Sequence, residues 1–260
     1  MKTLLLTLII SFWAYPCFAG TDEEKGLQIM QEVDRRDAGF GNSRADVKMI
    51  LKSSSSGEET LRLLRMDTLE VAGDGNKGLS IFDSPRDVKG TAFLSFTHAL
   101  EPDEQWLYLP ALKRVKRISS SNKSGPFVGS EFAFEDLTSF EVPKYKYKYL
   151  RDEKVNDQDC FVIELYPQYE ESGYTRQISW IDKERYIPLK VEYYDRKDAL
   201  LKTLEFKGYR QYLNQYWRAD EMLMTNHQTG KSTTLLSENF KFRTGLTVRD
   251  FDQNTLQRAR

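Results

Sequence analysis

Cysteine and histidine are scarce in this chain. Its 260 residues include two cysteines and two histidines, His98 and His227. Cys17 falls in the predicted leader described below, so Cys160 would be alone in the mature chain and no intrachain disulfide is expected. Metal-binding patterns such as H-E-x-x-H, C-x-x-C and the EF-hand loop are absent, as is the G-x-S-x-G turn of serine hydrolases. We therefore expect neither a metal nor another cofactor.

An excess of positive charge is also missing. Lysine and arginine number 38 against 39 aspartates and glutamates, which gives a formal net charge of −1. Nucleic-acid binders draw most of their affinity from cations that face phosphates. The sequence therefore predicts no nucleic-acid partner.

Long apolar runs are missing as well, apart from one short run at the N-terminus. Lys2 precedes a run of about ten apolar residues, Leu4 to Trp13, and Cys17-Phe18-Ala19 ends in the small-x-small pattern of a cleavage site. About twenty residues are needed to span a bilayer. Residues 1–19 are thus predicted to be an export signal cleaved after Ala19. A lipoprotein signal cut before Cys17 and an uncleaved anchor are the alternatives.

The mature chain is predicted to open with an amphipathic helix. Thr21 and Glu24 have the spacing of a capping box, and Leu27, Met30 and Val33 follow at helical spacing. Gly39 ends the pattern.

From residue 46 to residue 239 the hydrophobic period changes to two. Runs of six to twelve residues alternate with turn residues, which predicts about ten or eleven antiparallel strands. Residues 126–140 interrupt the pattern as an irregular insert, and residues 250–258 are predicted to form a short closing helix capped by Asp250, with Phe251 and Leu256 as its apolar contacts. No repeat or hinge divides the chain, so residues 20–260 are expected to form one α+β domain, mainly antiparallel β.

A hairpin near the middle of the chain combines aromatic residues with cations. Trp106 and Tyr108 lie on its first strand, and the return strand carries Lys113, Arg114, Lys116 and Arg117. Lysines on an edge strand discourage pairing with other chains. A positive rim beside an apolar face also attracts anionic lipid headgroups. Both interpretations remain open from the sequence.

The same segment carries a resemblance to a known family. The stretches W-x-Y-x-P-A-L-x-R-V-x-R, from Trp106 to Arg117, and F-x-G-S-x-F-x-x-E-D-L, from Phe127 to Leu137, resemble LolA-like periplasmic proteins, which are known as outer membrane lipoprotein-sorting proteins. Further support comes from I-S-W-I-D at Ile178 and Y-I-P-L-K-V-E-Y-Y-D at Tyr186. The resemblance implies an unclosed, strongly curved β half-barrel with covering helices, whose hollow holds the acyl chains of a cargo.

The chain departs from the lipoprotein chaperone itself, because it lacks the R-P-x-x-F-R-W strand of that protein. It is more similar to a divergent branch associated with lipid export and with RND-type membrane exporters. The cargo is accordingly a phospholipid, a hopanoid-like lipid or a lipoprotein, and no ligand residue is transferred from the chaperone.

Three functions follow as hypotheses. The first is a non-enzymatic periplasmic carrier that moves a lipid or lipoprotein between membranes and contacts them transiently. The second is an accessory module that docks on an inner-membrane RND-type exporter through the hairpin from Lys113 to Arg117, and the third is a lipid hydrolase that uses His98 or His227. The candidates for a pocket lining are large and apolar: Trp106, Tyr108, Phe127, Phe132, Phe134, Phe161, Ile163, Trp180 and Leu189. Lys113, Arg114, Lys116 and Arg117 are the candidates for a headgroup or membrane-surface contact.

Overall fold

A single antiparallel sheet contains all the strands of the described chain. The computed structural model describes residues 20–54, 57–254 and 256–258, so the predicted export signal lies outside the described residues. Within this part of the chain the sheet has 13 strands. They are β1 (Asn42–Lys52), β2 (Glu59–Leu69), β3 (Lys77–Ser84), β4 (Ala92–Phe96), β5 (Glu104–Leu109), β6 (Arg114–Arg117), β7 (Tyr145–Val155), β8 (Gln158–Pro167), β9 (Tyr174–Asp182), β10 (Pro188–Asp195), β11 (Leu200–Tyr212), β12 (Tyr216–Asn226) and β13 (Ser232–Phe242).

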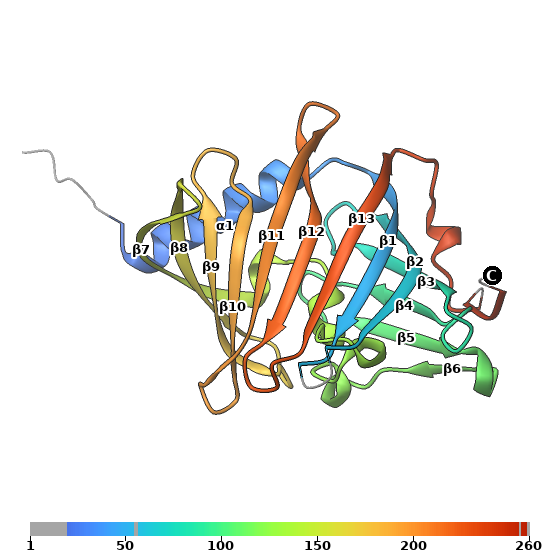
Figure 1. The fold of residues 1–260 in the computed structure, drawn as a ribbon. Coiled ribbons are helices and arrows are strands. Elements are labelled where there is room, and N and C mark those ends of the chain that lie inside the picture. The colour runs from blue at the N-terminus through green and yellow to red at the C-terminus, as the bar shows by residue number, and fades with distance from the viewer. Residues whose placement is uncertain (1–19, 55–56, 255, 259–260) are drawn as a thin grey trace, which may run out of the picture.

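The strand order consists of two sequential meanders joined at one seam. It runs β6-β5-β4-β3-β2-β1-β13-β12-β11-β10-β9-β8-β7, and only the neighbours β1 and β13 are distant in sequence. Strands β6 and β7 are the two edges and do not pair with each other, so the barrel stays open (Figure 1). The unclosed, curved sheet predicted from the sequence is confirmed.

Helix α1 (Asp22–Asp37) lies against the inner face of the sheet (Figure 1). Its capping box is present as predicted, because Thr21 Oγ1 accepts from the Glu24 N–H and the Glu24 carboxylate accepts from the Thr21 N–H. The contact with β7 is close: a Cβ at Gly26 would lie 2.9 Å from the Tyr149 backbone nitrogen. Only glycine lets the helix approach the strand at this distance.

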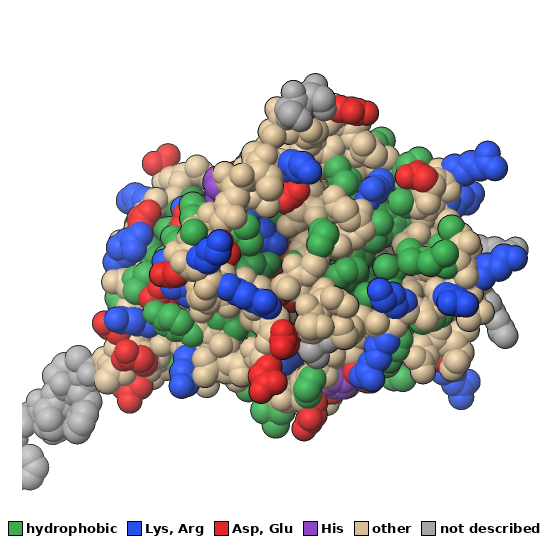
Figure 2. Space-filling view, turned by 90° about the horizontal axis from the view of Figure 1, so that it is seen from below, with side chains coloured by type: hydrophobic (Ala, Val, Ile, Leu, Met, Phe, Trp, Pro, Cys, Tyr) green, Lys and Arg blue, Asp and Glu red, His purple; other side chains and the backbone are tan. Residues whose placement is uncertain are grey.

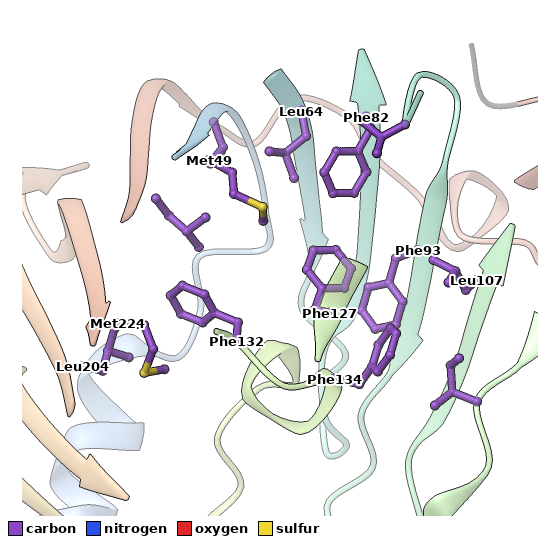
Figure 3. Packing of buried hydrophobic residues seen from close by; sticks show 14 of the residues in the cluster. Met49, Leu64, Phe82, Phe93, Leu107, Phe127, Phe132, Phe134, Leu204 and Met224 are labelled. Carbon is purple, nitrogen blue, oxygen red and sulfur yellow. The ribbon is translucent and has the colours of Figure 1, made fainter. Parts of the chain in front are cut away.

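The insert, residues 118–144, connects the two edge strands across the inner face. It contains short 3₁₀ turns, Ser120–Asn122, Phe127–Gly129, Phe134–Leu137 and Val142–Lys144. Figure 3 shows its rings stacked on the sheet: Phe127 contacts Phe82 and Phe93, with ring centroids 5.7 and 5.2 Å apart, and Phe134 lies beside them. The insert therefore covers part of the inner face over β2–β5, and the irregular structure predicted for residues 126–140 is confirmed.

Three details differ from the sequence prediction. The sheet has 13 strands instead of ten or eleven, because strands as short as β6, with four residues, give little periodicity. The described chain contains one α-helix instead of several covering helices. The predicted closing helix consists of two 3₁₀ turns, Val248–Asp250 and Leu256–Arg258, and Asp250 accepts from the Thr247 N–H that opens the first turn. Phe251 and Leu256 are nevertheless buried as its apolar contacts, on the outer face of the sheet.

Candidate functional site

A large hollow lies on the part of the inner face that the insert leaves uncovered. Its volume is about 1430 Å³, and its walls come from the sheet, from the C-terminal end of α1 and from insert residues around Phe132 and Phe140. Pockets for drug-sized ligands usually measure roughly 300–1,000 Å³. The hollow is thus large enough for a ligand bigger than a typical metabolite.

The sheet side of the hollow is lined by apolar side chains that remain partly exposed. Such side chains are unusual inside a sheet, because a filled core would bury them completely. They include Val33 of α1, Met66 of β2, Phe206 and Tyr209 of β11, Met222 of β12 and Phe240 of β13. Small hydroxyl residues stand between them, namely Ser80, Ser95, Ser179 and Ser237. The surface is apolar, and its own side chains do not fill the space in front of it.

A bulge in β13 contributes to this lining. Two residues, Asn239 and Phe240, oppose Ala45 of β1, because the pairing shifts between Arg44 with Lys241 and Asp46 with Glu238. Asn239 has φ +54°, a conformation that asparagine tolerates better than most residues. A bulge bends its strand and changes the direction of the next side chain. Phe240 consequently lines the hollow.

An ionic network fixes the insert to the floor of the hollow. Lys202 Nζ lies 2.6 Å from Asp136 Oδ2, and both side chains are at most 4% exposed. The other carboxylate oxygen accepts from the Tyr174 hydroxyl at 2.7 Å, and Lys202 also donates to the Glu131 carbonyl at 3.0 Å. Burial raises the pKa of Tyr174 well above its usual value, so the phenol stays a donor. Because these hydrogen bonds satisfy both charged groups, the buried ion pair is tolerated.

The neighbouring carboxylate, Glu135, makes a second anchor. It accepts from the Tyr169 hydroxyl, the Ser172 hydroxyl and the Gly173 N–H at 2.9–3.2 Å. Burial is the main cause that raises the pKa of Glu135, and the nearby charge of Asp136 adds to it. Insert and sheet are therefore held together by polar contacts as well as by the phenylalanine rings.

The C-terminal end of α1 is clamped beside the hollow by two arginines. Arg218 of β12 donates to Asp37, with Nη1 2.5 Å from Oδ1, and Arg36 donates to the Glu184 carbonyl at 2.7 Å. Arg36 also lies over the Tyr186 ring, 4.1 Å from its centroid. Burial raises the pKa of Asp37, although the Arg218 charge counteracts it. The helix forms one wall of the hollow because both of its ends are attached to the sheet.

The structure separates the nine predicted lining residues into three groups. Phe132 lines the hollow. Phe127 and Phe134 lie on the same face but are packed between the insert and the sheet, and Phe161 and Ile163 lie in the cluster packed against α1. The other four are in outer clusters: Trp106 and Tyr108 beside Phe251 and Leu256, and Trp180 and Leu189 beside Cys160. Alternation along a strand shows which residues share a face of the sheet, but it does not show which face is concave.

Several side chains that line the hollow were not predicted from the sequence, and they are mostly flexible or partly exposed. Met66, Met222 and Phe206 lie on central strands and line the hollow. The sequence signal that could have identified them is the occurrence of methionines on strands among polar neighbours, because the flexible methionine side chain fills irregular space. Their strands looked ordinary in sequence, and only the curvature assigns them to the hollow.

The basic hairpin, Lys113 to Arg117, lies at the open edge of the sheet and away from the hollow. Lys113, Arg114, Lys116 and Arg117 are all exposed, and none of them lines the hollow. Arg117 forms an ion pair with Glu104 at 3.2 Å. Figure 2 shows Lys and Arg side chains gathered on the right, at the end of the molecule where β5 and β6 lie in Figure 1. This position fits both interpretations of the segment, edge protection and an anionic contact.

The two histidines occupy different surroundings. His98 Nδ1 lies 2.7 Å from Asp74 Oδ2, and His227 Nε2 lies 2.7 Å from Thr203 Oγ1 in an exposed turn. Among the described residues, neither ring has a hydrogen bond to a serine or cysteine side chain, and no three metal-ligating side chains come together. None of the described helices is both long and apolar enough to cross a bilayer.

Comparison with known proteins places this fold. A family model described as an uncharacterized protein matches residues 74–258. A crystal structure from Vibrio parahaemolyticus, named as an outer membrane lipoprotein-sorting protein domain, shares 61% sequence identity and a TM-score of 0.89, and the match covers 90% of this chain and 99% of that one. The chain belongs to the LolA-like family of outer membrane lipoprotein-sorting proteins.

Two further structures agree with this LolA-like assignment. A DUF1329 family protein from Desulfovibrio piger has 27% identity and a TM-score of 0.85 over 91% of this chain and all of the other. A LolA superfamily protein from Nitrosomonas europaea has 19% identity and a TM-score of 0.71, over 88% and 98% of the two chains, and supports the fold alone. No curated protein matches significantly.

Proposed function

We propose that this LolA-like protein is a non-enzymatic periplasmic carrier that holds the acyl chains of a lipid or lipoprotein and moves it between membranes. The observation that carries the proposal is the hollow of about 1430 Å³, lined by partly exposed apolar side chains such as Met66, Phe206 and Met222. Its occurrence in a lipoprotein-sorting family supports the same conclusion.

The energetics of such a carrier require no catalysis. Each buried methylene contributes about 0.8 kcal/mol, so ten methylenes contribute ~8 kcal/mol, which corresponds to micromolar binding. Half-exposed lining side chains gain contact with the ligand at the same time, because they have no packing partner on the open side. The serine hydroxyls between them tolerate either water or a polar linkage of the cargo.

A charge placed in the hollow tests the proposal. Met222 lines the hollow, whereas its neighbour Leu223 points to the outer face of the same strand and is equally half-buried. We expect Met222→Lys to remove most of the lipid that copurifies with the protein from its native host, measured by mass spectrometry of extracts. Leu223→Lys is the matched control and should keep it. Wild-type protein free of lipid and unable to bind a fluorescent fatty acid would refute the carrier function.

A second function, an accessory module on an inner-membrane RND-type exporter, rests on the basic hairpin. Because Lys113, Arg114 and Lys116 are exposed at the edge of the sheet, a partner engaged there would leave the hollow free. Charge reversal of these three residues should abolish cross-linking to the exporter while the lipid content stays unchanged. If it abolishes binding to anionic vesicles instead, the hairpin serves as a headgroup contact.

A further inference from the structure

The tip of the β11–β12 hairpin contains a leucine in an unusual backbone conformation. The Gln215 N–H donates to the Tyr212 carbonyl at 3.0 Å, which closes a β-turn with Leu213 and Asn214 at its centre. Both central residues have positive φ, +50° and +56°. Glycine, asparagine and aspartate are the residues that such turns favour, because a Cβ crowds the backbone there and only glycine lacks one, while the short polar side chains of asparagine and aspartate compensate by hydrogen bonding to the local backbone.

The packing clusters of the described residues do not account for a leucine at this position. Leu213 is 51% exposed and belongs to none of the apolar clusters of the described chain. Asparagine would fit the turn better and would suit the solvent as well. Single exposed apolar residues are common, so it is the positive φ of Leu213, together with its exposure, that gives a reason to consider a contact made outside the chain.

The hairpin tip also borders the hollow. Gln211, Asn214 and Gln215 are among the residues that line it. The Tyr212 ring packs on Phe240 and Phe242, with centroids 5.6 and 5.3 Å apart, and Phe240 lines the hollow too. Leu213 is the chain neighbour of Tyr212, whose ring is joined through Phe240 to the hollow. In Figure 1 this hairpin projects beyond the other strands at the top of the molecule.

Cations alternate along β13 with the rings that contact Tyr212, and one more cation lies on β11 itself. Lys241 and Arg243 are exposed, and neither forms an ion pair within the described residues. Arg210 is 71% exposed and forms an ion pair with Asp220. A leucine and half-buried aromatic rings flanked by lysine and arginine match the interface of a bilayer that contains anionic lipid.

We propose that the β11–β12 hairpin is the membrane-inserting edge through which a lipid passes between an anionic bilayer and the hollow, with Leu213 as its anchor. The proposal rests on the carrier function proposed above. Insertion of Leu213 among the acyl chains would bring the rings of Tyr212 and Phe240 to the headgroup level. A lipid tail leaving the bilayer would then meet an apolar surface at each step.

The test compares two exposed leucines on different hairpins. Leu213→Asn removes the apolar side chain and relieves the turn, so the variant folds, whereas Leu112→Asn is the control, since Leu112 is 63% exposed beside the basic hairpin. The full mature chain is mixed with vesicles of phosphatidylethanolamine and phosphatidylglycerol, 3:1 by mole. Burying a leucine side chain is worth about tenfold in an equilibrium constant, so Leu213→Asn should weaken cosedimentation with vesicles about tenfold. Its urea unfolding midpoint should not fall.

Transfer of a fluorescent phospholipid between two vesicle populations is the second measurement. Leu213→Asn should slow it in proportion to the lost affinity, and Leu112→Asn should leave it unchanged. Unaltered vesicle binding by Leu213→Asn, an equal loss with Leu112→Asn, or a wild-type protein that carries lipid without binding vesicles would each overturn the proposal. None of these results affects the carrier function, because that depends on the lipid content of the Met222→Lys protein.

Discussion

The ion pair between Lys202 and Asp136 stabilises the insert at the scale of single residues. Removing one partner of such a buried pair leaves an uncompensated charge in a poorly solvated place, which usually costs about 3–5 kcal/mol. The remaining donors to Asp136 are the Tyr174 hydroxyl and the Ala133 N–H. They cannot replace a full positive charge.

We therefore expect Lys202→Met to lower the free energy of unfolding by about 3–5 kcal/mol. Urea unfolding followed by tryptophan fluorescence would measure it. The double variant Lys202→Met with Asp136→Asn should lose clearly less, since no charge is left buried. A Lys202→Met protein within about 1 kcal/mol of the wild type would contradict the role given to this pair.

The raised pKa of Glu135 predicts that the stability of the protein depends on pH. Its pKa is raised in the folded state, mainly by burial, so folding is favoured when the group is protonated. That contribution is present at low pH and is lost as the pH rises through the folded pKa. Glu135→Gln, which is always neutral and keeps acceptor and donor atoms for Ser172 and Gly173, should gain stability relative to the wild type as the pH rises from 4 to 7. If the two proteins differ in free energy of unfolding by the same amount at pH 4 and pH 7, the raised pKa of Glu135 does not contribute to the pH dependence of stability.

Residue patterns alone could not locate the hollow. Trp106 and Trp180 are large and sit on alternating strands, yet they are packed on the outer face, beside Phe251 and Cys160 respectively. Phe132 lines the hollow, but Phe127 of the same motif does not, so the motif does not separate them either. Alternation specifies two faces, but the direction of curvature, which decides which one is concave, depends on the whole sheet.

At the scale of elements, α1 depends on one glycine. The helix packs on β7 so closely that an alanine methyl at position 26 would come within 3.1 Å of backbone atoms of Lys148 and Tyr149. Backbone cannot move aside as a flexible side chain can, so the helix itself must shift. Because α1 forms one wall of the hollow, the same shift would change the hollow.

Gly26→Ala should consequently destabilise the protein by about 1–3 kcal/mol through overpacking, although alanine is the better helix former. Gln28→Ala, on the exposed side of the same helix, is the control and should be neutral or slightly stabilising. Thermal unfolding by circular dichroism compares the two. Equal stability of both variants would mean that the helix does not rest on β7 as tightly as described.

The elements themselves were largely predictable, each for a local reason. The capping box of Thr21 and Glu24 is a contact within one turn, and the strand runs carry a clear period of two. The prediction of a closing helix was wrong because Phe251 directly follows one 3₁₀ turn and Leu256 begins another, and such turns are hard to distinguish from a short helix by composition.

At the scale of the whole molecule, a partly exposed apolar lining predicts stabilisation by ligand. A ligand that binds only the folded state at a hundred times its Kd adds about 2.7 kcal/mol. For a chain of this size, that corresponds to a rise in Tm of roughly 5–10 °C. A long-chain fatty acid should produce this rise in delipidated wild-type protein and in Leu223→Lys, but not in Met222→Lys. An equal rise in all three proteins would place the ligand outside the hollow.

The pairing of β1 with β13 determines when the hollow can form during folding. Val47 pairs with Ser237 there, whereas the neighbours within each meander follow one another along the chain. A contact between segments about 190 residues apart forms slowly, since the entropy of closing so long a loop must be overcome first. Each half can form hairpins as it emerges from synthesis, but the concave surface is complete only after β13 has joined β1. A partly folded chain therefore has no complete hollow, and under the proposed carrier function cargo would be acquired only after β13 has paired with β1.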